Sequence, residues 1–139
     1  MGAAADWSSL ESFSFGDSPQ MADDLLASVL AGEKTATCWS VAEGELTTVG
    51  KRMVVKDGAG EPRVVLETVE LTQRRFDAVD EAFALAEGEG IRSLQDWRDS
   101  HQRYFARNGG FSPDMMLWCE RFRLVEILPI EDLAEGDGQ

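Results

Sequence analysis

The chain has few of the residues from which metal centres and covalent cross-links are built. Its 139 residues include one histidine, His101, and two cysteines, Cys38 and Cys119. These three residues show none of the spacings of a zinc motif, so we expect no metal and no cofactor. Both cysteines lie in apolar, strand-like runs, which predicts buried free thiols in a reducing cytoplasm.

Basic residues are also scarce, with 13 Lys and Arg against 26 Asp and Glu and a net charge of −13. This balance argues against sequence-independent binding of nucleic acid. The charge is uneven, however, because residues 92–123 carry six arginines against four acids. This excess predicts a local basic face, unless the arginines only pair with nearby acids on solvated surfaces.

Long apolar runs are absent as well, and none reaches the length of a membrane span. The first six residues lack the basic and apolar regions of a signal peptide, so we expect a cytoplasmic protein without a membrane partner. The length suits one domain, and 43% hydrophobic residues argue against general disorder. We expect an N-terminal extension over residues 1–17, one domain over 18–130 and an acidic tail over 131–139.

Local signals divide the domain into helices and strands. Ser18 and Pro19 predict the start of a helix that ends at Gly32, Asp77 is expected to cap a second helix, and Ser93 a third over residues 94–107. Strands are expected over residues 35–40, 51–56, 63–72 and 115–128, with a hairpin turn at 57–60. This order predicts an α+β fold in which a mostly antiparallel sheet forms a small, closed or half-closed β-barrel with flanking helices.

Lys34 and Thr37 follow the first helix and are candidates for chemistry. A threonine hydroxyl becomes a nucleophile when a base takes its proton, and a lysine of lowered pKa can be that base. A nearby glutamate would favour the ammonium form and could instead orient the lysine. Positions three apart on a strand face opposite sides, so the two side chains meet only if Lys34 still lies in the turn after Gly32, or if its long side chain curls over. Otherwise Lys34 simply follows the helix and Thr37 pairs across the sheet.

Several separated motifs resemble the bacterial single-domain type of the ASCH domain family, in the PUA-like superfamily. They cover about residues 18–127 and include Gly32–Thr37, Glu43–Glu45, Phe83–Gly90 and Cys119–Phe122. The resemblance implies a PUA-like β-barrel with a cleft for RNA or nucleosides. One ASCH subgroup hydrolyses N4-acylated cytidines through a Lys, a Thr and a Glu, and other bacterial members are linked to cleavage of single-stranded RNA. Lys34 and Thr37 match the first two residues, and Glu89, in the segment Glu87-Gly88-Glu89, is taken as the counterpart of the third.

The third predicted helix offers further candidates for substrate binding. Its start, with Arg92 and Ser93, could hold an anion. Aromatic side chains could stack on a base, and His101 could act as a base, although residues at helical spacing are often core residues. The predicted substrate-binding set is Trp39, Arg92, Ser93, Trp97, His101 and Tyr104.

Three functions remain open from the sequence. The first is a metal-independent amidohydrolase acting on a modified nucleoside, and the second is a ribonuclease acting on single-stranded RNA. The third is an RNA-binding module without catalysis. The sequence leaves open whether the protein is a monomer or a homodimer.

Overall fold

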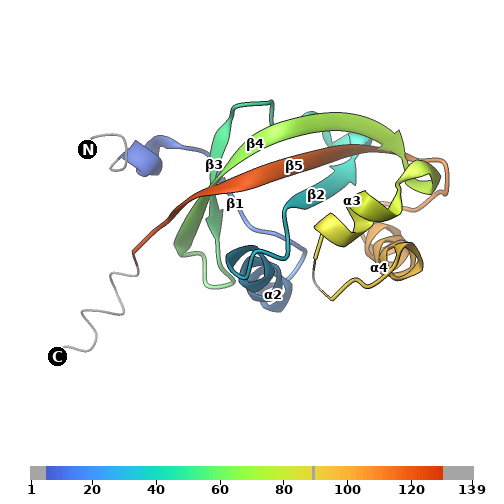
Figure 1. Ribbon diagram of the computed structural model, residues 1–139, viewed down its shortest axis with the longest axis horizontal. Helices are drawn as coiled ribbons and strands as arrows, with labels where there is room; N and C mark the ends of the chain where they lie inside the picture. The colour runs from blue at the N-terminus through green and yellow to red at the C-terminus, as the bar shows by residue number, and fades with distance from the viewer. Residues whose placement is uncertain (1–5, 89, 130–139) are drawn as a thin grey trace.

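The computed structural model describes residues 6–88 and 90–129 and has five strands in one sheet, in the order β1-β3-β4-β5-β2 (Figure 1). The strands are β1 (Ser12–Phe13), β2 (Ala36–Ser40), β3 (Arg52–Lys56), β4 (Pro62–Arg75) and β5 (Met116–Ile127). The helices are α2 (Pro19–Leu30), α3 (Glu81–Ala86) and α4 (Leu94–Arg107), with short 3₁₀ turns η1 (Asp6–Ser9), η2 (Val41–Glu43) and η3 (Phe76–Ala78).

The long antiparallel pair of β4 and β5 forms the centre of the sheet. The pairs β3–β4 and β2–β5 are also antiparallel, whereas β1 pairs with β3 in parallel. The predicted α+β class with mostly antiparallel strands is therefore confirmed. Within the described residues β1 and β2 form the two edges of the sheet, so the structure does not show a closed barrel.

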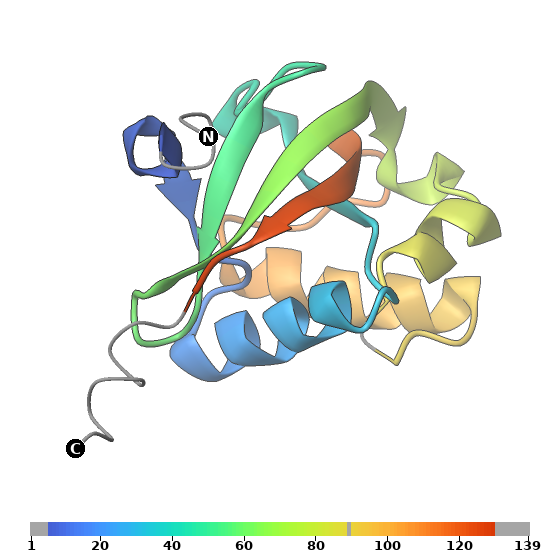
Figure 2. The same ribbon diagram turned by 60° about the vertical axis from the view of Figure 1, so that its left-hand side comes forward.

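Helices α2 and α4 lie on the same side of the sheet (Figure 2). The apolar stripe of α2, with Leu25, Leu26 and Val29, is buried against Val55 and Val64 of the sheet. A second cluster joins α3 and α4 to β2 and β5, with members that include Phe76, Phe83, Trp97, Phe105 and Leu117. The helices thus cover one face of the sheet with two separate apolar cores.

Local capping signals predicted two helix starts correctly and one wrongly. The side-chain oxygens of Ser18 and Ser93 accept hydrogen bonds from the N–H groups three residues later, as expected. Asp77, in contrast, lies in the 3₁₀ turn η3 and pairs with Arg75. Asp80 caps α3 by accepting from the Phe83 N–H at 2.9 Å. Both aspartates are good capping residues, and the 3₁₀ turn between them delays the helix by one turn.

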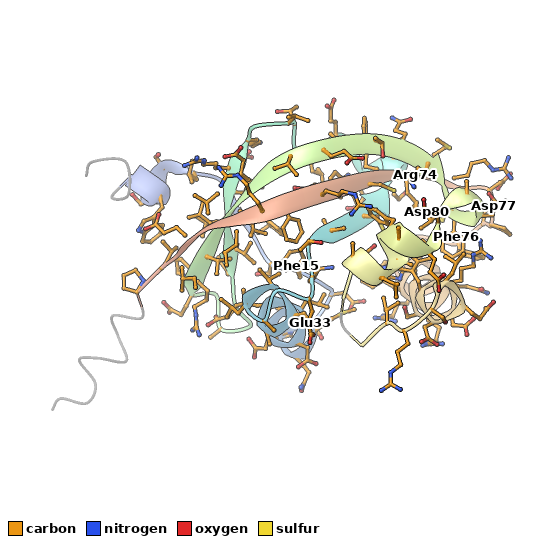
Figure 3. All side chains as sticks on the ribbon, viewed as in Figure 1. Phe15, Glu33, Arg74, Phe76, Asp77 and Asp80 are labelled. Carbon is orange, nitrogen blue, oxygen red and sulfur yellow. The ribbon has the colours of Figure 1, made fainter. Side chains whose placement is uncertain are left out.

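Residues predicted as an N-terminal extension contact the body of the protein. Phe13 belongs to β1, and Phe15 is only 5% exposed within the core that α2 covers (Figure 3). The boundary at residue 18 stays a prediction, and the acidic tail over 131–139 lies outside the described residues. None of the described helices is long and apolar enough to cross a membrane.

A close backbone approach joins the end of α3 to the segment before β2. The Thr35 N–H donates to the Ala86 carbonyl at 2.7 Å. Gly88 has φ +69°, and a Cβ built there would lie 2.8 Å from the Glu33 carbonyl oxygen and 3.0 Å from Lys34 Cα. Only glycine allows both this conformation and this approach.

We expect Gly88→Ala to destabilise the protein far more than Gly60→Ala. Both glycines have positive φ, but a Cβ at Gly60 would meet nothing within 4 Å. The conformational cost of each substitution is about 1 kcal/mol, and the backbone clash at Gly88 adds about 1–3 kcal/mol. Urea unfolding gives both free energies of unfolding. Equal losses in the two variants would show that the close approach at Gly88 does not constrain the fold.

Candidate functional site

Lys34 lies in the turn between α2 and β2, before the strand begins. Gly32, at φ +81°, follows the end of α2, and the N–H groups of Glu33 and Lys34 donate to the Ser28 carbonyl at 2.9 and 3.1 Å. Since β2 starts at Ala36, strand alternation does not separate Lys34 from Thr37. Both residues line the same pocket. This agrees with the prediction that the two side chains meet if Lys34 still lies in the turn after Gly32.

The Lys34 side chain is buried, with the whole residue 2% exposed, and it forms an ion pair. Its ammonium nitrogen Nζ lies 3.2 Å from Glu87 Oε1. It also donates to the carbonyl oxygens of Ala36 at 2.9 Å and Glu87 at 3.3 Å. A buried ammonium is tolerated only with such partners, because two backbone acceptors and a carboxylate replace the water that it loses.

Glu87 is the acidic member of this pair and is also 2% exposed. Its Oε2 accepts a hydrogen bond from Trp97 Nε1 at 3.1 Å and lies 3.4 Å from His101 Nε2. Burial alone would raise the pKa of Glu87, but the charges of Lys34 and His101 and the hydrogen bonds from His101 and Trp97 outweigh it. They hold the pKa of Glu87 well below its usual range, so the group is a carboxylate at neutral pH.

A small pocket opens beside this pair, between α2 and α4. Its volume is about 100 Å³, and α2 contributes Met21 and Leu25 to its wall. Four predicted site residues line it, namely Lys34, Thr37, His101 and Tyr104. Ligand sites commonly measure about 300–1,000 Å³, so this pocket is large enough for only part of such a ligand.

The other predicted substrate-binding residues have different surroundings, and their substrate-binding role stays a prediction. Trp97 is fully buried and stacks on His101, with ring centroids 4.4 Å apart. Trp39 lies on β2 outside the pocket, and its Nε1 donates to the Gly44 carbonyl at 2.8 Å. Ser93 caps α4, and the backbone N–H of the exposed Arg92 donates to the Asp96 carboxylate. Glu89 lies outside the described residues.

Two pocket residues were missed by the sequence reasoning. Glu87 is the other carboxylate of the Glu-x-Glu segment, and it lies four residues after the buried Phe83. That helical spacing could have indicated a carboxylate on an apolar face. Cys38 lines the pocket from β2, and burial and the Glu87 carboxylate raise the pKa of its thiol well above the usual value. Both cysteines are free, as predicted.

A second carboxylate lies across the sheet from Thr37. Glu120 on β5 is the register partner of Thr37, and its Oε2 accepts a hydrogen bond from the Thr68 hydroxyl at 2.7 Å. Burial raises the pKa of Glu120, although the Thr68 hydrogen bond and the charge of Lys34 act in the opposite direction. Glu120 is therefore a carboxyl group that holds its proton to a higher pH than usual.

Half of the arginines in the basic stretch are paired with acids. Three of the six have carboxylate partners, and a fourth, Arg98, donates to the Asp77 carbonyl. The three ion pairs are Arg107–Asp17 at 2.7 Å, Arg121–Glu70 at 3.6 Å and Arg123–Glu67 at 3.0 Å. These three arginines therefore match the alternative of solvated, paired surface charges.

A family model for the ASCH domain matches residues 11–126, which is most of the chain. The chain belongs to the ASCH domain family. No curated protein sequence gives a significant match.

Solved structures support the same assignment. Protein EF3133 from Enterococcus faecalis V583 is 31% identical with a TM-score of 0.81, and the match covers 93% of this chain and 83% of that one. The ASCH domain from Lactobacillus crispatus JV V101 is also 31% identical, with a TM-score of 0.77 and coverage of 84% and 79%. A point mutant of the ASCH protein from Zymomonas mobilis is 15% identical with a TM-score of 0.50, covers 93% and 81%, and supports the fold alone.

We expect Lys34→Ala to lower the free energy of unfolding of this ASCH domain by about 3–5 kcal/mol, because it leaves the Glu87 carboxylate buried without its cation. Lys51→Ala is the matched control. Lys51 also pairs with a glutamate, Glu11, but its side chain is 34% exposed, so its loss should cost about 1 kcal/mol or less. Urea unfolding followed by tryptophan fluorescence measures both. A small, equal effect in the two variants would contradict the importance of the buried pair.

Glu120→Gln should change how stability depends on pH. A carboxyl group with a raised folded-state pKa stabilises the fold below its unfolded value of about 4.5, and this contribution is lost as pH rises toward the folded value. The amide that replaces the Glu120 carboxyl group stays neutral at every pH. The melting temperature of the variant should therefore rise relative to that of the wild type as pH increases from about 4 toward 7. Glu67→Gln should give the opposite trend, because Arg52 and Arg123 lower the pKa of Glu67. Parallel curves for Glu120→Gln and wild type would refute the raised pKa.

Proposed function

We propose that this ASCH-domain protein is a metal-independent amidohydrolase that removes an acyl group from a neutral nucleoside of the N4-acylated cytidine type. The observation that carries the proposal is the pocket in which Lys34, Thr37 and the Glu87 carboxylate come together. These are the three residue types of the amidohydrolase subgroup, with Glu87 as the described carboxylate. The counterpart role of Glu89 remains the sequence prediction.

Thr37 is the nucleophile of the proposed reaction. Its hydroxyl oxygen attacks the acyl carbon, the bond from that carbon to the cytosine N4 breaks, and water then hydrolyses the acyl-threonine to a carboxylic acid and free Thr37. The overall proton transfer in the first step runs from the Thr37 hydroxyl to N4.

In the proposed reaction Lys34 acts as a charged ammonium paired with Glu87, and not as a neutral lysine base. The carboxylate keeps Lys34 as an ammonium, which can hydrogen-bond to the acyl oxygen as negative charge develops there. In the proton transfer, the ammonium gives one proton to N4 and the resulting amine takes the proton of Thr37. Glu87 favours the return of Lys34 to the charged state after each step.

Charge and size favour a small neutral substrate over RNA. The net charge of −13 repels a polyanion, and half of the arginines in the basic stretch are paired with carboxylates. A pocket of about 100 Å³ suits an acyl substituent and the edge of one base. A neutral nucleoside meets no such repulsion.

We expect the purified protein to release cytidine and acetate from N4-acetylcytidine, and Thr37→Ala to lower kcat by about three orders of magnitude or more. Thr37→Ser keeps a hydroxyl and should retain much of the activity. Thr35→Ala is the control, since Thr35 is exposed two residues earlier and should behave as wild type. Turnover is followed by chromatography, with melting temperatures to confirm folding.

The same protein, incubated with labelled single-stranded RNA over a range of salt concentrations, separates the other functions. Turnover of the neutral nucleoside should barely respond to salt, whereas RNA affinity would fall steeply. Absent deacylation together with salt-sensitive RNA cleavage or binding would replace this proposal by a ribonuclease or an RNA-binding module.

A further inference from the structure

Three different metal-binding side chains meet at the inner wall of the pocket. They come from β2, the end of α3 and the middle of α4, and are Cys38, Glu87 and His101. Their ligand atoms all lie within 4.8 Å of one another. We propose that these three side chains form a zinc-binding site whose fourth position opens into the pocket.

The hydrogen bonds of His101 orient its ring as a metal ligand. Its Nδ1 lies 3.0 Å from the Trp97 carbonyl oxygen, and this oxygen can only accept a hydrogen bond. Nδ1 therefore carries a proton, and Nε2 faces Glu87 Oε2 at 3.4 Å, where the charged ring donates to the carboxylate. A ligating histidine typically donates its other N–H to a backbone carbonyl or carboxylate in this way.

Glu87 is held in place for the same role. Lys34 binds its Oε1, and Trp97 Nε1 donates to its Oε2, so the carboxylate is fixed from two sides. A proton lies between Nε2 and the negative oxygen of Glu87 when His101 is charged. A zinc ion takes the place of that proton and gains both atoms as ligands.

The distances suit zinc after a small movement. Zn–N and Zn–O bonds of about 2.0–2.2 Å and a Zn–S bond of about 2.3 Å separate tetrahedral ligand atoms by about 3.3–3.6 Å. The separation of 3.4 Å between His101 Nε2 and Glu87 Oε2 falls in this range. Cys38 Sγ lies within 4.8 Å of the ligand atoms of Glu87 and His101. It therefore has to move toward them by little more than ~1 Å to reach the separation in a zinc site, which a side-chain rotation can achieve.

A mixed set of sulfur, nitrogen and oxygen with an open position selects zinc or cobalt over magnesium or calcium, which prefer oxygen alone. All three residues line the pocket, so water or another small ligand takes the fourth position. The Lys34 ammonium on the far oxygen of Glu87 reduces the affinity but leaves Oε2 available. This site shares Glu87 with the proposed hydrolase, although the hydrolase chemistry itself uses no metal.

The test uses the full chain after treatment with a chelator. Zinc is titrated by calorimetry, and cobalt(II) by absorption, where a thiolate-to-cobalt charge-transfer band and intense tetrahedral bands report the ligands. We expect one ion per chain and a charge-transfer band. Cys38→Ser should abolish that band. Cys38→Ser and His101→Gln should each weaken zinc binding by about a hundredfold or more, because each removes a ligand and loss of a supporting residue alone costs about tenfold to a hundredfold.

Cys119→Ser is the matched control, since Cys119 lies opposite Cys38 in the β2–β5 pair but outside the ligand set. It should bind zinc and cobalt as the wild type does. Wild-type protein that is folded by circular dichroism yet gives no charge-transfer band would overturn the site and leave His101 and Glu87 as a simple ion pair. Equal effects of the two cysteine variants would also overturn it. Deacylation by the chelated protein is measured separately, so the two proposals can fail independently.

Discussion

The arrangement of the site depends on the burial of the Lys34–Glu87 ion pair. Each charge loses its water and has to recover that interaction from protein groups. The Ala36 carbonyl, the Glu87 carbonyl, the Trp97 indole and the His101 ring supply the partners. Because these groups belong to β2, the end of α3 and α4, the pair requires a fixed relation between three segments. The close approach at Gly88 makes that relation sterically possible.

This arrangement also explains how a strongly acidic chain can hold a polar pocket without concentrating negative charge there. The ammonium and carboxylate largely cancel, so the pocket wall has polar groups without a large net charge. Three of the six arginines in the basic stretch have carboxylate partners, which reduces the positive charge open to a polyanion. Thr37 and Cys38 of β2 line the pocket beside the Lys34 ammonium and the Glu87 carboxylate. These surroundings favour small, uncharged groups over a polyanion.

The parts of the fold with local signals were predictable. The starts of α2 and α4 depend on serine side chains that bind N–H groups three residues away, and both were predicted at the correct residue. The start of α3 was misplaced because Asp77 and Asp80 carry the same capping signal, and Asp77 lies in a 3₁₀ turn whose flanking residues Phe76 and Val79 are buried in the core. A closed or half-closed barrel was predicted from the order of the elements and from the family resemblance, and the described strands leave β1 and β2 as edges.

The extents of the long helices and of β2 to β5 could be predicted to within a few residues, because capping, turn and alternation signals lie close together in the chain. The same local reasoning singled out the lysine and threonine after Gly32. The short strand β1 was not predicted, because its parallel pairing with β3 depends on the fold. Which carboxylate meets Lys34 depends on the fold and follows from no local pattern. Glu87 lies 53 residues further along the chain, and its partnership depends on the whole fold bringing α3 against the turn before β2. The physical reason is that the cost of a buried charge is offset only by a specific opposite charge at contact distance, and no local pattern encodes that distance.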